Sequence, residues 1–557
     1  MKVEINKKLR AKGKNCYIKS NKHFINLLKY IYLFSMFIIT YHNCRNLIHL
    51  SSEINLVIRG SGNQSLLNDS FYIEPSEIFV NGILRDSCKM FCELENEENN
   101  VTLIFNTSIE SCEIMFAELD NIIEINLFNF DFSSITSMAF MFKNLANLEK
   151  INFGNINTSS VIDMRGVFYN CTKLEILDLS NFDTSLVTTM EEMLYNCTNL
   201  ISIDLSNLNT KKVQTMRRLI YNCSKLETLN LSSFDTSSVT SMEAMFYKCS
   251  NLLSLDITNF NTKKVQTMRR LFFYCSKLET LNLSSFDTSS VTNMEALFYQ
   301  CSKLSSLDIS KFDTSKVENM IYIFRDCTNL KYINLGEMNT TSLINMECFF
   351  YHCESLESID LSSFDTSSVT SMGWMFFHCY SIKTIIIPET FNTSKVVSMY
   401  SMFNHCKSLI SLNLSTFDTT KVTEMCFMFN NCIKLKYLDL SNFSPINVTT
   451  MESMFNKMSS LVYLNLYSFD INNQTNMTSS FNALPSNLKI CATKNNTKNY
   501  LSRLNKNNIC SDICFNKNIK LDIIEDECIN SCKDKIYNMN LIIFVIIIHA
   551  LKEVILS

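Results

Sequence analysis

Cysteine is the residue type in this sequence with the most chemistry to offer. One of its patterns is a C-x-x-x-C pair that occurs three times: Cys88 and Cys92, Cys510 and Cys514, Cys528 and Cys532. Four thiolates near the carboxyl end could hold zinc, but the usual zinc spacing is C-x-x-C. We therefore predict disulfides rather than a metal site: two that close a small carboxy-terminal knob, and Cys88–Cys92 near the amino end.

A row of histidines offers a second kind of chemistry. His352, His378 and His405 each stand directly before a cysteine, at nearly constant spacing. Three stacked imidazoles could bind a transition metal. Equivalent positions elsewhere hold Asn, Lys, Tyr or Gln, which favours a merely polar, exposed column. We predict no metal and no cofactor.

These residues must be positioned by a repeat. Methionine recurs every 26 residues from Met138 to Met372 and, after one extra residue, from Met399 to Met477. A cysteine follows each methionine by seven residues from Cys171 to Cys432. A fixed period of this length predicts a solenoid whose units stack on their neighbours. Parallel Cβ vectors in such a stack disfavour disulfides, so we expect these cysteines to be buried free thiols.

One unit, Leu226–Cys249, shows the expected local structure. Leu229 and Leu231 alternate as in a short strand. Asp235 and the two residues after it suit a turn and a helix N-cap. From Val239 onward, apolar residues recur at three- and four-residue steps, which is typical of a helix. The expected fold is therefore an α/β solenoid: a leucine-rich-repeat-like stack of about 14–15 strand–turn–helix rungs, with a parallel sheet on one face.

The rest of the chain divides around this array. A basic segment precedes an apolar stretch within 1–45, which predicts a signal peptide or signal anchor. The apolar tail at the carboxyl end predicts either a lipid-anchor signal or a truncated membrane span. The expected divisions are 1–45 (signal), 46–109 (amino-terminal cap), 110–485 (solenoid), 486–538 (Cys-rich segment) and 539–557 (apolar tail).

The predicted strands present one polar column that could serve recognition. Its members are carboxylates or amides, which alternate from Asp204 onward: Asp178, Asp204, Asn230, Asp256, Asn282, Asp308, Asn334 and Asp360. Ser and Thr flank them, and no G-G-x-G-x-D motif of calcium-binding solenoids is present. We expect this strand face to be the recognition surface, because the concave sides of solenoids commonly bind partners.

Composition and motifs argue against several function classes. The net charge is −4, which attracts no nucleic acid. Arginine and glutamate alternate from rung to rung at Glu191, Arg217, Glu243 and Arg269, so we expect mutual neutralisation rather than a basic patch. The sequence contains no Gly-rich phosphate loop, H-E-x-x-H or G-x-S-x-G motif. We therefore predict that the protein is not an enzyme.

The repeat resembles the BspA-like family of leucine-rich-repeat surface proteins, whose units read roughly L-x-x-L-D-L-S-x-F-D-T-S-x-V-x-x-M-x-x-M-F-x-x-C. Segments 174–197 and 278–301 match nearly every position. The resemblance implies a non-enzymatic protein, secreted or membrane-tethered at the cell surface, that adheres to an extracellular protein or glycan. Several N-x-S/T sequons predict a glycoprotein. The alternative is a surface-coat protein that self-associates.

Overall fold

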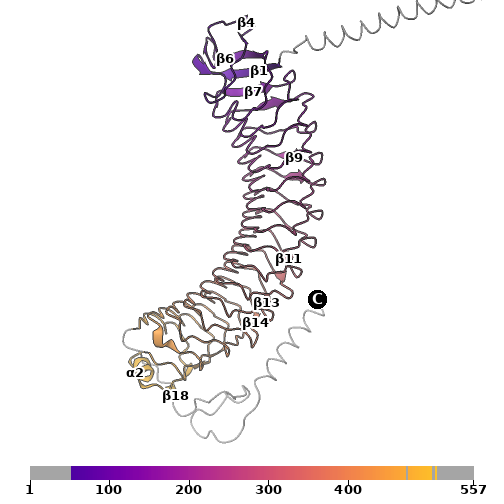
Figure 1. Ribbon diagram of the computed structural model, residues 1–557. Coiled ribbons are helices and arrows are strands. Elements are labelled where there is room, and N and C mark those ends of the chain that lie inside the picture. The colour runs from indigo at the N-terminus through magenta and orange to yellow at the C-terminus, as the bar shows by residue number, and fades with distance from the viewer. Residues whose placement is uncertain (1–51, 472–474, 505–508, 511–557) are drawn as a thin grey trace, which may run out of the picture.

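A computed structural model describes residues 52–471, 475–504 and 509–510. Figure 1 shows a cap of strands at the amino-terminal end, followed by a long curved stack of rungs. The predictions for the amino-terminal signal, for Cys514, Cys528 and Cys532, and for the apolar tail lie outside the described residues. Within those residues, no helix combines the length and apolar character that crossing a bilayer requires.

The amino-terminal cap is a six-stranded sheet that changes from antiparallel to parallel pairing. Its order is β4-β3-β6-β1-β7-β8, and β2 pairs with β5 in a separate ribbon. The strands are β1 (Ser52–Arg59), β2 (Gly62–Ser65), β3 (Glu77–Val80), β4 (Ile83–Leu84), β5 (Phe91–Leu94), β6 (Glu98–Phe105), β7 (Ile122–Asn126) and β8 (Lys150–Asn152). Because β7 pairs antiparallel with β1 and parallel with β8, it joins the cap to the stack.

Short parallel strands occupy one side of the stack. They pair between successive rungs without a register shift, as in Leu229 opposite Ile203. The strands are β9 (Ser202–Asp204), β10 (Thr228–Asn230), β11 (Ser306–Asp308), β12 (Tyr332–Asn334), β13 (Ser358–Asp360), β14 (Thr384–Ile386), β15 (Tyr437–Asp439), β16 (Tyr463–Asn465), β17 (Lys489–Cys491) and β18 (Ile509–Cys510). We call this side, with its outward columns at Thr228 and Asn230 and their equivalents, the strand face.

The predicted helix in each rung is wrong, and the fold is a β-solenoid of about 14 turns rather than an α/β solenoid. In the described residues, helix is confined to α2 (Asn495–Arg503) and the 3-10 turn η1 (Pro445–Asn447). Opposite the strand face, fourteen parallel bridges run rung to rung from Ser111 to Asn476. We call this side, formed by Ser241–Lys248 and its equivalents, the turn face.

Two consecutive tight turns imitate the helical spacing. Tyr247 N–H donates to the Ala244 carbonyl three residues back, at 3.2 Å. Ala244 and Lys248 themselves donate to carbonyls of the next rung, at 2.9 and 2.7 Å. Both of these residues have positive φ, 54° and 57°, which a right-handed helix forbids. Apolar residues therefore recur at three- and four-residue steps because turns, not helical periods, return them to the core.

The left-handed conformation recurs at the same two positions in all fifteen rungs. Among them are bulky residues such as Ile114, Phe140 and Trp374. This conformation costs a residue other than glycine about 1–2 kcal/mol. Hydrogen bonds to the next rung must offset that cost, so the turn geometry depends on stacking and does not exist in an isolated rung.

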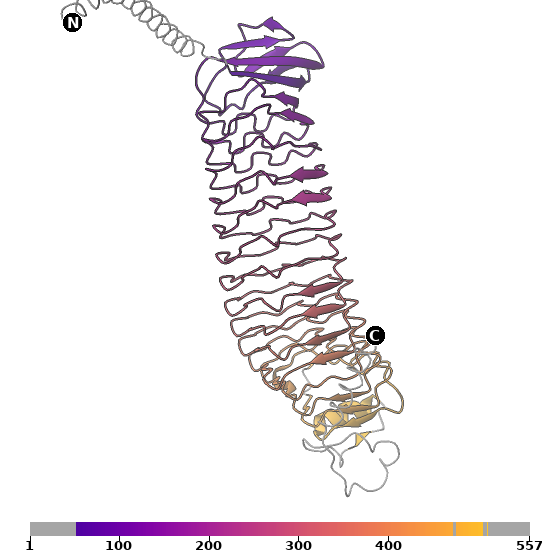
Figure 2. The same ribbon diagram turned by 90° about the vertical axis from the view of Figure 1, so that its right-hand side faces the viewer.

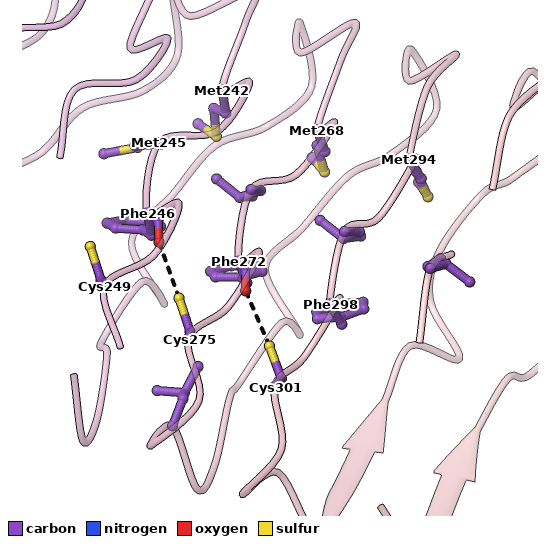
Figure 3. Packing of buried hydrophobic residues seen from close by; sticks show 14 of the residues in the cluster. Met242, Met245, Phe246, Cys249, Met268, Phe272, Cys275, Met294, Phe298 and Cys301 are labelled. Atoms are coloured by element: carbon purple, nitrogen blue, oxygen red, sulfur yellow. Dashed lines mark hydrogen bonds between the residues drawn. The ribbon is translucent and has the colours of Figure 1, made fainter. Parts of the chain in front are cut away.

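The core is one continuous cluster along the stack, in which methionine, phenylalanine and cysteine form columns from rung to rung (Figure 3) beside buried leucine, isoleucine and valine. The thiol of Cys275 donates to the carbonyl of Phe246 in the preceding rung, at 3.1 Å. The same bond recurs for all eleven cysteines of the column, and all are buried and free. Burial raises the pKa of these thiols, so they stay protonated and act as hydrogen-bond donors. The expectation of buried free thiols is confirmed.

A buried threonine column ties each rung to the next. The hydroxyl of Thr236 donates to the Asn261 carbonyl at 2.9 Å and accepts from the Asn261 N–H at 2.7 Å. Equivalent threonines from Thr158 to Thr419 are also buried. At this point the backbones of neighbouring rungs do not bond to each other directly. The threonine hydroxyl bonds to the N–H and carbonyl of the next rung in their place.

The stack bends away from the strands. In Figure 1 the strands lie on the outer side of the arc, and Figure 2 views that side face on. Tyrosine rings on the turn face stack 4.3–4.4 Å apart, as from Tyr169 to Tyr247. Buried phenylalanines just after the strands lie farther apart, 6.4 Å between Phe260 and Phe286. The strands therefore lie on the outer side of the bend, and the predicted recognition surface is convex rather than concave.

Candidate recognition surface on the strand face

The predicted recognition column lies where expected along the strand ends, and all eight members are exposed. Each uses its Oδ1 atom to accept the backbone N–H two residues on, as Asp308 does from Ser310 at 2.9 Å. Asn282 and Asn334 bond to Ser284 and Gly336 in the same way, at 3.0 and 3.3 Å. This turn ends the strand and holds the side chain outward, so the other carboxylate or amide atom faces solvent.

Hydrogen bonds lower the pKa of four carboxylates in this column, Asp178, Asp204, Asp256 and Asp308. Hydrogen bonds from the side chain and backbone of Ser310 lower the pKa of Asp308, and the amide of Asn334 adds to the effect. Ser206 and Thr258 lower the pKa of Asp204 and Asp256 likewise. The rungs of Asp204, Asp256 and Asp308 therefore each carry an ionised carboxylate at neutral pH. The rungs between them carry an amide.

A shallow groove of about 450 Å3 crosses three rungs of this face. Asn282, Asp308 and Asn334 line one side of it, and Thr280, Ser306 and Tyr332 line the other. The Leu281 and Leu307 side chains form the floor between the two columns. The groove therefore combines donors, acceptors and apolar surface, which is the mixture found in small-molecule binding sites.

Tyr332 is the residue in this groove that sequence analysis missed. It is 57% exposed, and within the described part of the chain its ring stacks on no other ring and its hydroxyl has no hydrogen-bond partner. The signal was present in the sequence: Tyr332 ends the run Ser202, Thr228, Ser254, Thr280 and Ser306, and tyrosine recurs at this strand position at Tyr437 and Tyr463. A smaller pocket of about 90 Å3 lies beside Asp178.

The turn face contrasts with this arrangement, because its polar side chains bond to one another. Arg269 contacts Glu243 and Glu295 on the rungs before and after it, at 3.1 and 3.0 Å. Arg217 bridges Glu191 and Glu243 in the same way. The alternating charges therefore neutralise each other along the stack, and this face presents no basic patch.

Aromatic rings on the turn face are likewise occupied by their neighbours. Five successive ring pairs from Tyr169 to Tyr299 are stacked nearly parallel, with centroids 4.3–4.6 Å apart. The rings lie face to face along the stack and show only their edges to solvent. A ladder of this kind offers no free ring face to a nucleobase or a sugar.

The histidine column belongs to the same face. Neighbouring ring centroids of His352, His378 and His405 are 4.4 Å apart. His378 shares a hydrogen bond with the hydroxyl of Tyr380 at 2.9 Å. Burial is the main cause that lowers the pKa of His378 to about 4, and the neighbouring His352, His405 and Lys407 lower it further. Among the described residues, no group of three or more His, Cys, Asp or Glu side chains is placed to hold a metal ion.

The cysteine pairs are only partly described. The structure joins Cys88 and Cys92 by a disulfide in the amino-terminal cap. Cys491, in β17, is also disulfide-bonded, and the sequence analysis did not assign it to a pair. Cys510 lies in β18 opposite Cys491, while the remaining carboxy-terminal cysteines fall outside the described residues.

A family model matches the whole stack in four overlapping segments, 110–228, 199–305, 275–388 and 374–491. The chain belongs to the DUF285 family. Its description is "Mycoplasma protein of unknown function", so membership establishes a repeat solenoid and assigns no activity. The family match establishes the repeat, and the BspA-like resemblance stays a prediction.

Comparison with solved structures and curated proteins adds little. One matching structure is the crystal structure of a TLR13–ssRNA13 complex, at 16% sequence identity, covering 72% of this chain and 83% of that one. Its TM-score is 0.18, so no argument about fold or ligand rests on it. No match was found among curated proteins.

Proposed function

We propose that this chain is a non-enzymatic, extracellular surface protein of the BspA-like type that recognises a protein or glycan partner through its strand face. The observation that carries the proposal is the contrast between the two faces. Turn-face side chains bond to each other across rungs, whereas the strand-face column leaves one carboxylate or amide atom of each rung open to solvent. Some column members also contact each other, as Asn152 does Asn126, but the column keeps exposed polar atoms that suit contact with another molecule.

Further features support an extracellular location. The Cys88–Cys92 disulfide and the oxidised Cys491 are typical of an oxidising compartment. The basic and then apolar amino-terminal sequence fits entry into a secretory pathway. Detection of the protein on intact cells with an antibody against the solenoid is the direct measurement. Signal only after permeabilisation would contradict this part of the proposal.

The recognition role is tested by neutralising the column without disturbing its turns. Asp204→Asn, Asp256→Asn and Asp308→Asn combined keep the Oδ1 acceptor, as the natural Asn rungs do. The protein is produced without N-glycosylation, because each change creates a sequon. Full-length protein is applied to protein and glycan arrays, and we expect the variant to lose at least tenfold in affinity for the wild-type ligands.

A matched control changes the same charge elsewhere. Asp69→Asn, Asp86→Asn and Glu113→Gln affect exposed residues of the cap and the first rung, away from the strand-face column. This variant should bind like the wild type. Equal binding by the strand-face variant would exclude that face, and binding only to further copies of the chain would favour the surface-coat alternative.

A further inference from the structure

The strand face has a period of two rungs, which is longer than the repeat that builds it. From Ser202 to Asp308, rungs reading Ser-x-Asp alternate with rungs reading Thr-x-Asn. Two rungs span about 10 Å along the stack, given the usual spacing of paired strands. A ligand that follows this face therefore meets the same group every second rung and a different one in between.

We propose that the groove around Tyr332 binds an extended β-1,4-linked oligosaccharide without negative charges, laid along the axis of the stack. The inference rests on the proposed function and names the ligand class for the same face. Each sugar of such a chain advances by close to one rung and is flipped relative to the one before it. Equivalent edges of the chain thus recur every second rung, which matches the alternation of carboxylate and amide.

The groove supplies the contacts that a sugar ring needs. The free ring of Tyr332 packs against the apolar C–H face of one sugar. Asp308 lies on the neighbouring strand and accepts hydrogen bonds from ring hydroxyls, and its ionised state strengthens them. Asn282 and Asn334, one rung to either side, donate through their amides to the flipped sugars.

Charge disfavours polyanionic chains along the same path. Asp256 and Asp308 are ionised, and Glu227 and Glu279 are exposed next to the strand face. Sulfate or carboxylate groups at regular spacing would meet these carboxylates repeatedly, and Lys311 and Lys331, beside Asp308 and Tyr332, offset only part of that repulsion, so we expect a sulfated glycan to bind more weakly than a neutral one. An extended peptide repeats its side chains at a shorter interval than two rungs, so it does not keep the register.

The test measures binding of full-length protein to four hexasaccharides by calorimetry. We expect β-1,4-linked hexamers of glucose and of N-acetylglucosamine to bind, and their comparison shows whether an amide on the sugar is used. An α-1,6-linked glucose hexamer and a heparin hexasaccharide should bind at least tenfold more weakly. Equal binding of the α-1,6 chain, or preferential binding of heparin, would overturn the proposal.

Two variants connect the affinity to the groove. Tyr332→Ala should weaken binding of the β-1,4 hexamers at least tenfold, while Tyr332→Phe, which keeps the ring, should bind within about threefold of the wild type. Tyr72→Ala removes a similarly exposed ring, 68% exposed, from the cap and should have no effect. Unchanged binding by Tyr332→Ala would exclude this groove.

Failure here is distinguishable from failure of the broader function. If the Asp204, Asp256 and Asp308 triple variant loses a protein ligand but no β-1,4 hexamer binds, the recognition role stands and the glycan is wrong. If the hexamers bind and none of the strand-face variants changes their affinity, the strand face itself is wrong.

Discussion

On the turn face of this solenoid, side chains of one rung bond to side chains of the next: glutamate to arginine, tyrosine to tyrosine, histidine to histidine. On the strand face, each column side chain bonds to its own rung, as Asp308 does to Ser310, and bonds between rungs, such as Asn152 to Asn126, are fewer. Both faces are equally regular in sequence. A regular column of residues therefore does not indicate a binding surface by itself. The number of exposed polar atoms that have no partner on a neighbouring rung is the better guide.

The largest expected difference between the faces comes from their aromatic residues. Phe272→Ala, buried in the turn-face core, should destabilise the protein by about 3–5 kcal/mol, because it leaves a cavity between two neighbouring phenylalanines. Tyr332→Ala on the strand face should change stability by less than about 0.5 kcal/mol. Urea denaturation followed by circular dichroism measures both, and similar losses would contradict the assignment of roles.

A single rung provides a comparison between two threonines. Thr236→Val should cost about 2 kcal/mol, because the N–H and carbonyl of Asn261 lose their buried partner. Thr228→Val, eight residues earlier and exposed on the strand face, should be close to neutral. The same denaturation measurement applies. A neutral Thr236→Val would mean that the threonine column does not join the rungs.

The thiol column should have a smaller effect. Cys275→Ala should destabilise the protein by about 1 kcal/mol, because it removes a small volume and the donor to the Phe246 carbonyl. Alkylation of the native protein at pH 8 should leave this cysteine unmodified, because burial keeps the thiol protonated and inaccessible. Rapid labelling without denaturant would show that the turn face opens.

The histidine stack should contribute the smallest effect, and only with pH. Folding lowers the pKa of His378 from 6.5 to about 4, so the unfolded chain binds more protons between these values. Stability should be full above about pH 6.5 and decrease toward pH 4, by less than about 1 kcal/mol because solvent screens a partly exposed ring. His378→Asn, which suits the positive φ of 61°, should reduce the slope of urea midpoint against pH. An unchanged slope would exclude His378 as its source.

The sequence was sufficient to predict the stack, its period and its buried columns, because a 26-residue beat of Met and Cys is the pattern that stacked, equivalent rungs produce. It misled on the turn face, because two tight turns place Met242, Met245 and Phe246 at helical spacing. A local signal pointed the other way. Asparagine stands at the second left-handed position in five rungs, at Asn144, Asn170, Asn196, Asn222 and Asn431, and asparagine tolerates that conformation best after glycine.

The strand-face column lies at the strand ends and its recognition role stays a prediction, whereas the groove and the convex curvature were not predicted. The groove depends on Tyr332 standing above Ser306 in the neighbouring strand, a relation between rungs that periodicity does not express. The curvature is a property of the whole stack, which bends so that the strands lie on its outer side. The sequence of a single repeat unit therefore predicts neither the groove nor the curvature.

The alternating charges of the turn face also limit the number of rungs that can be inserted by duplication. Adding one rung beside Arg217 or Glu243 would place like charges on adjacent rungs, where their partners now lie about 3 Å away. Adding two rungs restores the alternation on the turn face and on the strand face alike. Residues 209–260 and 261–312 are nearly identical segments of that double length. Because opposite charges alternate from rung to rung, duplication of two rungs at a time is favoured. Relatives of different length should therefore differ by even numbers of rungs.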